Sequence, residues 1–167
     1  MMIGNVGGSG GRVDEGKCVD LICLIDSNSS VRVRILGRNR PGGTPYNDYL
    51  DAELVVTSAF ASGRLGLCLS PEVMDDWSTA LNELSDRQGI SWTAMGDIGI
   101  RIEIDRQFSV PRPIVTVDDG GESGVSVRVV LDPGNGWVDE LREQLGRVRQ
   151  MWPNEVVMTP RSRDYWQ

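Results

Sequence analysis

The sequence contains no histidine, and only three of its 167 residues are cysteines. Histidine is the usual general base of hydrolytic triads, the commonest metal ligand and the one side chain whose ordinary pKa lies near neutrality. Its absence excludes most familiar hydrolase sites and any histidine-based metal centre. Three cysteines cannot all pair and no secretory signal precedes them, so we expect reduced thiols and a cytoplasmic protein.

Long apolar runs are also missing, because no stretch approaches the roughly 20 apolar residues that a membrane helix needs. The apolar content of 40% still suffices for one globular domain. The formal charge is −7, and residues 41–90 carry eight acidic side chains against two basic ones. A negative chain repels nucleic-acid backbones and attracts basic proteins at low salt. We therefore expect a protein partner and neither nucleic acid nor membrane.

The two ends of the chain lack the periodic apolar pattern of folded elements. Residues 1–17 are rich in Gly and Ser, which predicts a flexible tail. Residues 154–167 follow a helix-ending proline and are predicted to form a C-terminal tail. A single domain is expected between them, over residues 18–153.

Period-two alternation and short apolar runs predict most of the secondary structure as strands. The predicted strands cover residues 18–25, 31–35, 51–58, 63–69, 98–104, 114–117 and 125–131. Asp26-Ser27-Asn28-Ser29 and Asp118-Asp119-Gly120-Gly121 have the composition of hairpin turns. These hairpins favour antiparallel pairing.

Two amphipathic helices are predicted, each after a group of strands. Ser70 and Pro71 have the residue types that begin a helix, and Gly89 follows its end. The second helix is expected from about Trp137 to Trp152. We therefore predict an α+β fold, with a mostly antiparallel sheet of about seven to eight strands and two helices packed on one face. The two halves of the chain have the same predicted order, antiparallel strands followed by one helix. This similarity could reflect an internal duplication or chance.

The tryptophans and tyrosines divide into two groups by their surroundings in the sequence. Trp77 and Trp137 lie on the apolar stripes of the predicted helices and should be buried. The others fall in or near less regular segments, where they could anchor a partner if exposed. These residues are Tyr46, Tyr49, Trp92, Tyr165 and Trp166.

The first predicted helix carries the strongest candidate for a functional surface. Its candidate partner-binding residues are Glu72, Asp75, Asp76, Glu83 and Asp86, and the single nearby base is Arg87. Such a surface could attract and hold a basic protein, although a solvated helix face explains the same pattern. We assign no catalytic residue, no metal site and no cofactor.

A second candidate is the arginine cluster formed by Arg32, Arg34, Arg38 and Arg40. Together with the Gly-rich loop that follows, it could bind an anionic ligand or serve an enzyme with carboxylate or arginine chemistry. The alternative is that these arginines form ion pairs with Asp51 and Glu53 on neighbouring strands. A third possibility is a structural subunit of a larger assembly, which would expose a large apolar patch.

Several runs of sequence resemble a Streptomyces-type family that carries a domain-of-unknown-function label. They are Asp20-Leu21-Ile22-Cys23-Leu24, Ser30-Val31-Arg32-Val33-Arg34-Ile35-Leu36-Gly37-Arg38, Asp48-Tyr49-Leu50-Asp51-Ala52-Glu53, Ser62-Gly63-Arg64-Leu65-Gly66-Leu67-Cys68-Leu69-Ser70-Pro71 and Gly136-Trp137-Val138-Asp139-Glu140. The resemblance spans about residues 18–153 and implies a compact cytoplasmic domain. It implies no catalytic residues.

The order of strands, capped helix, strands and final helix is more distantly similar to bacterial immunity proteins that neutralise toxins. Our hypothesis from the sequence is a non-enzymatic domain, immunity-like or antitoxin-like, whose acidic helix binds a basic partner protein. The sequence leaves the oligomeric state open.

Overall fold

The computed structural model describes residues 19–39, 49–94, 96–121 and 123–153. The predicted tails at 1–17 and 154–167 lie outside the described residues. In chain order the elements are β1 (Val19–Ile25), β2 (Ser30–Arg38), β3 (Leu50–Thr57), β4 (Ser62–Leu69), α1 (Pro71–Ser85), β5 (Ile90–Ala94), β6 (Ile98–Asp105), β7 (Arg112–Asp119), β8 (Ser126–Val130) and α2 (Trp137–Met151).

The strands form two antiparallel four-stranded sheets, in the orders β1-β2-β3-β4 and β5-β6-β7-β8. Each sheet is followed directly by one helix. The α+β class and the antiparallel pairing are therefore confirmed, whereas the strands are divided between two sheets rather than one. The division falls at Ser70-Pro71, where α1 begins with Ser70 as its N-cap and carries the chain to the second sheet.

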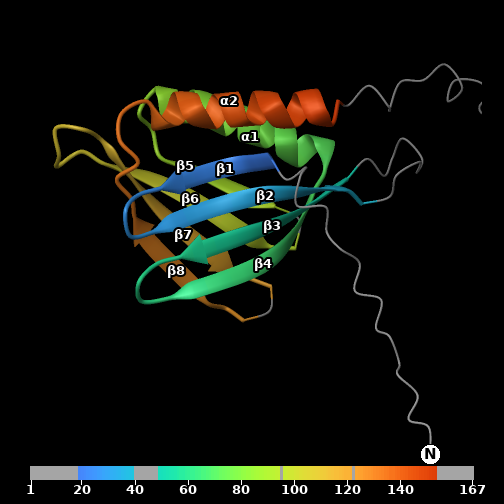
Figure 1. The fold of residues 1–167 in the computed structure, drawn as a ribbon, viewed down its shortest axis with the longest axis horizontal. Coiled ribbons are helices and arrows are strands. Elements are labelled where there is room, and N and C mark those ends of the chain that lie inside the picture. Colours follow the sequence, from blue (N-terminus) through green and yellow to red (C-terminus); the bar gives the residue numbers. More distant parts are fainter. Residues whose placement is uncertain (1–18, 40–48, 95, 122, 154–167) are drawn as a thin grey trace, which may run out of the picture.

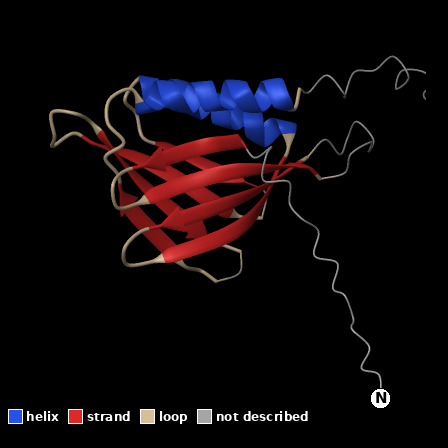
Figure 2. Cartoon of the chain, in the orientation of Figure 1, coloured by secondary structure: helices blue, strands red, loops and turns tan. Residues whose placement is uncertain are grey.

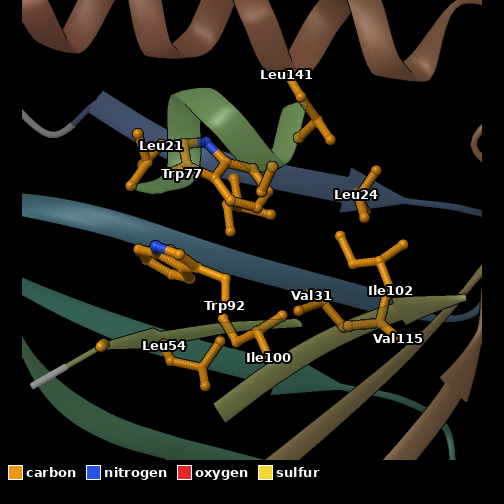
Figure 3. Close-up of a cluster of buried hydrophobic side chains, with 14 of the residues drawn as sticks. Leu21, Leu24, Val31, Leu54, Trp77, Trp92, Ile100, Ile102, Val115 and Leu141 are labelled. Atoms are coloured by element: carbon orange, nitrogen blue, oxygen red, sulfur yellow. The ribbon is translucent and has the colours of Figure 1, made fainter. Parts of the chain in front are cut away.

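The inward faces of the two sheets form one continuous apolar core. Alternation places Val31, Val33 and Ile35 of β2 on the inward face of the first sheet. Ile100 and Ile102 of β6 lie on the inward face of the second sheet in the same way. Figure 3 shows side chains from both sheets and both helices meeting in this core. A sheet with one apolar face needs a second apolar layer, and each sheet supplies that layer to the other.

The two helices lie side by side along one side of the strands (Figures 1 and 2). Helix α1 packs against β5, the first strand of the second sheet, and α2 packs against β1, the first strand of the first sheet. The predicted tryptophans of both helices, Trp77 and Trp137, are buried as expected. The helices thus cover the β1 and β5 edges, while β4 and β8 form the opposite edges.

The interpretation of Trp92 as part of a less regular segment was wrong. Trp92 lies in β5 with only 2% of its surface exposed, and its ring lies 5.2 Å from that of Trp77 between centroids. Its Nε1 donates a hydrogen bond of 2.9 Å to the carbonyl oxygen of Val73 in α1. The alternation of buried Ile90, Trp92 and Ala94 is the signal for this strand, but it covers only five residues.

Asp26 connects the β1–β2 turn with the segment that precedes α2. Its Oδ1 accepts hydrogen bonds from the backbone N–H groups of Asn28 (2.7 Å) and Ser29 (2.8 Å), and its Oδ2 accepts one from Asp132 (3.1 Å). The carboxylate of Asp132 in turn lies 2.8 Å from Arg112. Partial burial acts to raise the pKa of Asp26, but the three backbone donors outweigh it and lower that pKa below its ordinary value of 3.8.

Replacing Asp26 by Asn tests this connection, because Asn keeps one acceptor oxygen and removes the charge. We expect Asp26→Asn to lower the free energy of unfolding by about 1–2 kcal/mol at pH 7. The folded-state pKa lies below the unfolded value, so the charge stabilises the fold above pH 3.8 and loses this effect as the pH falls through the folded pKa. Urea unfolding of both proteins at pH 7 and near pH 3 should therefore show a difference that shrinks in acid.

Exposed Glu103 provides the control for this experiment, as Glu103→Gln removes a carboxylate from the outer surface of β6. The interpretation of Asp26 is wrong if both substitutions give the same small change at both pH values.

The two packed tryptophans differ in one hydrogen bond, and this difference can be measured. Trp77 Nε1 is buried without a partner among the described residues, whereas Trp92 Nε1 is bonded to Val73. Trp92→Phe and Trp77→Phe remove similar indole volume, but only the first removes a hydrogen bond, the one to the carbonyl oxygen of Val73. We expect Trp92→Phe to lower the free energy of unfolding by about 1–2 kcal/mol more than Trp77→Phe in urea denaturation. Equal losses would show that the hydrogen bond contributes nothing measurable.

Candidate functional site

Helix α1 holds its carboxylates on the surface because its opposite face is fixed in the core. The buried stripe consists of Met74, Trp77, Ala80, Leu81 and Leu84. All the carboxylates predicted to bind a partner are exposed, namely Glu72, Asp75, Asp76, Glu83 and Asp86. We call this set the acidic helix surface. The last turn of α1 contains no basic residue, and Asp86 is the C-cap, so negative charge also collects at the carbonyl end of the helix.

The acidic helix surface has two sides with different surroundings. On the side toward α2, Asp75 Oδ1 lies 3.0 Å from the guanidinium of Arg149, and Asn82 Oδ1 accepts a hydrogen bond of 3.4 Å from Arg142. Asp75 therefore holds the two helices together at its position. Because Arg149 already neutralises it, Asp75 contributes less to attracting a partner than the other carboxylates.

On the side away from α2, the helix and β5 form a groove with an acidic lining. Its volume is about 330 Å³, and its lining residues are Asp76, Thr79, Ala80, Glu83, Ser91, Trp92 and Thr93. Asp76 and Glu83 come from α1, while Ser91 and Thr93 are the outward-facing residues of β5. We call this feature the acidic groove. It combines two carboxylates with three side-chain hydroxyls, and no basic side chain of the described residues lines it.

Arg101 of β6 lies directly opposite Ser91 in the strand register. Its guanidinium lies 3.6 Å from the carboxylate of Asp118 on the next strand. Arg101, the basic residue that lies beside the groove on the neighbouring strand, is therefore already paired with Asp118. This pairing leaves the two carboxylates in the groove as its dominant charges.

The arginines of β2 lie on the outward face of the first sheet, where alternation places them. Arg34 lies 3.5 Å from Asp20 and 3.9 Å from Glu53, and Arg32 lies 4.0 Å from Asp20. Arg64 of β4 approaches the other oxygen of Glu53 at 3.2 Å. These five side chains form one ion-pair network across the sheet, so two members of the arginine cluster already have acidic partners.

The rest of the arginine cluster is arranged differently. Arg38 donates a hydrogen bond of 3.0 Å to the carbonyl oxygen of Pro153, just after α2. Arg40 lies outside the described residues. Asp51, the other acidic partner considered for these arginines, accepts a hydrogen bond of 2.7 Å from the side chain of Asn39. The described part of the cluster is thus spread along β2, with Arg32 and Arg34 in the network around Asp20 and Arg38 bonded to the segment after α2.

The thiols on the first sheet are poor nucleophiles. Burial and the nearby carboxylate of Asp20 raise the pKa of Cys23 above its ordinary value, despite an opposing effect of Arg32. Burial and the carboxylate of Asp51 likewise raise the pKa of Cys68. Because their pKa values are raised, both cysteines are predominantly protonated at neutral pH. The thiolate is the reactive form, so neither side chain is an effective nucleophile.

The sequence identified the acidic wall of the groove but missed the hydroxyl wall. Ser91 and Thr93 were not considered because the strand that carries them was not predicted. The alternation of Ile90, Trp92 and Ala94 would have revealed it, since the residues between them must then face outward. The groove itself forms where α1 packs on β5. It could not be predicted from the sequence, because no sequence pattern indicates that these two elements are in contact.

Neither described helix is both long and apolar enough to cross a membrane. Among the described residues, no three cysteine, aspartate or glutamate side chains are grouped so that they could hold a metal ion. No curated protein and no solved structure matches the chain. A family model does match it, over residues 19–153. Since that match covers most of the sequence, the chain belongs to DUF5959, a family of unknown function.

Proposed function

We propose that the protein is a non-enzymatic binding domain, and that its acidic groove takes a basic side chain of a partner protein. The observation that carries this proposal is the lining of the groove, in which Asp76 and Glu83 face a space beside Ser91 and Thr93. In the part of the chain that the structure describes, no basic residue shares this lining. A guanidinium or ammonium group entering this space finds carboxylate and hydroxyl acceptors on two sides. Arginine suits it best, because its planar group donates several hydrogen bonds in fixed directions.

The remaining carboxylates extend the attraction beyond the groove. Glu72 and Asp86 lie near the two ends of α1, so the negative potential continues along the whole helix. Exposed charges at the edge of an interface mainly increase the rate of association, while desolvated pairs at its centre control dissociation. In this proposal Asp76 and Glu83 form the central pair, and Glu72 and Asp86 guide the partner toward it.

Two features of the chain favour binding over catalysis. Histidine is absent, and the pKa values of Cys23 and Cys68 are raised, which makes both thiols weak nucleophiles. The arginines of the competing anion site, Arg32 and Arg34, lie in ion pairs on an open sheet face. In this proposal the protein acts as an immunity protein or antitoxin, the role that the order of strands and helices suggested, so a basic toxin domain is the first class of partner to test.

Charge reversal in the groove tests the proposal. We expect the double variant Asp76→Arg, Glu83→Arg to bind a fluorescent arginine-rich peptide at least about tenfold more weakly than the unmodified protein, because one central charge pair contributes about 1.4 kcal/mol or more. Fluorescence anisotropy gives the Kd values. The matched control is Glu103→Arg, Glu143→Arg, which makes the same change in net charge at exposed positions outside the groove. Equal weakening by both double variants would refute a specific site.

The ionic-strength dependence provides a separate check on the groove. Exposed charge pairs are screened over about 8 Å at physiological salt. We therefore expect the Kd of the peptide to rise steeply between low and high NaCl for the unmodified protein. The groove variant should show a much flatter salt response, whereas the control variant should retain most of the slope. A groove variant with the full salt slope would place the attraction elsewhere on the surface.

A further inference from the structure

A second cavity lies on the opposite side of the molecule from the helices, between the β4 side of one sheet and the β8 side of the other. Its volume is about 350 Å³ and its lining is mostly apolar. The apolar lining comes from β3, β4, β7 and β8 and includes Val56, Leu65, Val117 and Val127. We call it the inter-sheet cavity. Figure 1 shows the two helices on the other side of the strands, so no described helix covers β4 and β8.

The apolar pattern of β4 ends in a glycine where the strand lines the cavity. Gly63 has the same parity as Leu65 and Leu67, which face inward, and it lies opposite Val56 in the register. A Cβ placed on Gly63 would meet no atom within 4 Å. The position is therefore exposed at the end of β4 and has room for a side chain beside the cavity that it lines. A glycine inside a strand often marks a place where another group approaches closely.

The hairpin that forms one side of the cavity also presents an exposed aromatic ring. Phe60, in the β3–β4 turn, is 100% exposed. The turn is fixed by Ser58, whose N–H donates to the carbonyl oxygen of Ala61 at 2.8 Å and whose Oγ accepts from the N–H of Ala61 at 3.0 Å. Phe60 N–H also donates to Ser58 Oγ, at 3.3 Å. Because the backbone of this turn is already ordered, binding of the ring costs only the rotamer freedom of the Phe60 side chain.

We infer that a second copy of this chain occupies the inter-sheet cavity, and that each copy inserts its Phe60 into the cavity of the other. The ring and the cavity are adjacent in sequence, since Ala61 and Ser62 line the cavity. One surface thus contains both the inserting group and its receptor, which is the requirement for a contact related by a twofold axis. An aromatic ring also fits the apolar lining and a space of this size.

The charges around the cavity are compatible with self-association. The chain carries a formal charge of −7, so most of its surface repels a second copy. Among the described residues, the charged ones that line the cavity are Arg64 on β4 and Asp119 on β7. Within its own copy Arg64 is paired with Glu53, and Asp119 accepts hydrogen bonds from Ser123, so the described lining adds no net charge that would repel a second copy.

Removal of the ring tests the inference without disturbing the core. We expect the unmodified protein to be in concentration-dependent equilibrium between 18.4 kDa and twice that mass in analytical ultracentrifugation. Phe60→Ala should weaken the dimer by about a hundredfold, because two buried aromatic contacts are lost and each accounts for roughly tenfold. The control is Phe108→Ala, which removes the chain's other phenylalanine, 47% exposed and stacked against Arg112 away from the cavity. This control should leave the dimer unchanged.

Filling the cavity gives an independent variant. Gly63→Leu places a side chain into the open space and should raise or maintain the Tm, since its Cβ meets no atom within 4 Å and the change removes a glycine from a strand. The same variant should abolish the dimer because it leaves no room for the second copy's Phe60. A loss of dimer with an intact Tm separates occupation of the cavity from a general loss of structure.

Mixing the two variants tests the reciprocal arrangement. Phe60→Ala retains an open cavity and Gly63→Leu retains the ring, so a mixed pair can form one of the two insertions. We expect a heterodimer whose Kd lies between that of the unmodified dimer and those of the two variants alone, measured with one variant fluorescently labelled. The inference is wrong if the protein stays monomeric up to about 1 mM. At that concentration, only a dimer whose free energy of association is weaker than about 4 kcal/mol would escape detection. A dimer that Phe60→Ala leaves intact also overturns the inference. Binding of a small apolar dye by a purely monomeric protein would instead assign the cavity to a small ligand.

Discussion

The fold depends on an exchange of helices between two similar halves. Helix α1 follows the first sheet but packs against β5 of the second, and α2 follows the second sheet but packs against β1 of the first. Neither half, taken as four strands and a helix, can bury both its sheet face and its helix stripe alone. The ring contact between Trp77 of α1 and Trp92 of β5 lies at one of these crossings. The apolar core therefore forms as one cooperative unit rather than as two independent domains.

The same exchange determines where the two candidate surfaces lie. Because both helices cover the β1 and β5 edges, the outer side of α1 and the outward residues of β5 enclose the acidic groove. The β4 and β8 edges have no such cover, and Gly63 and Val125 lie at the opening that remains between them. A polar groove and an apolar cavity thus arise on opposite sides from one arrangement of elements.

The sequence was sufficient to predict elements whose residues are close together in the chain. Alternation located seven strands, and the Ser70-Pro71 cap and the apolar stripe located α1. The pairing of the carboxylates could not be predicted in the same way, since Arg149 and Asp75 are 74 residues apart and meet only after the helices pack. The division into two sheets was missed because period-two patterns give the face of a strand and not its neighbours. The sequence alone shows that Gly63 alternates in step with Leu65 and Leu67. This position can be assigned to a cavity only when the opposing sheet is known.

The two surfaces also constrain each other. A dimer joined at its inter-sheet cavities would place the helices of both copies on its outer sides, because the helices lie on the far side of each copy from β4 and β8. Both acidic grooves would then remain accessible and would point away from each other. A partner with two basic sites on a suitable span could engage both grooves, and the second binding event would occur at an increased effective concentration. Self-association would thus strengthen binding to such a partner without changing a single contact in either groove.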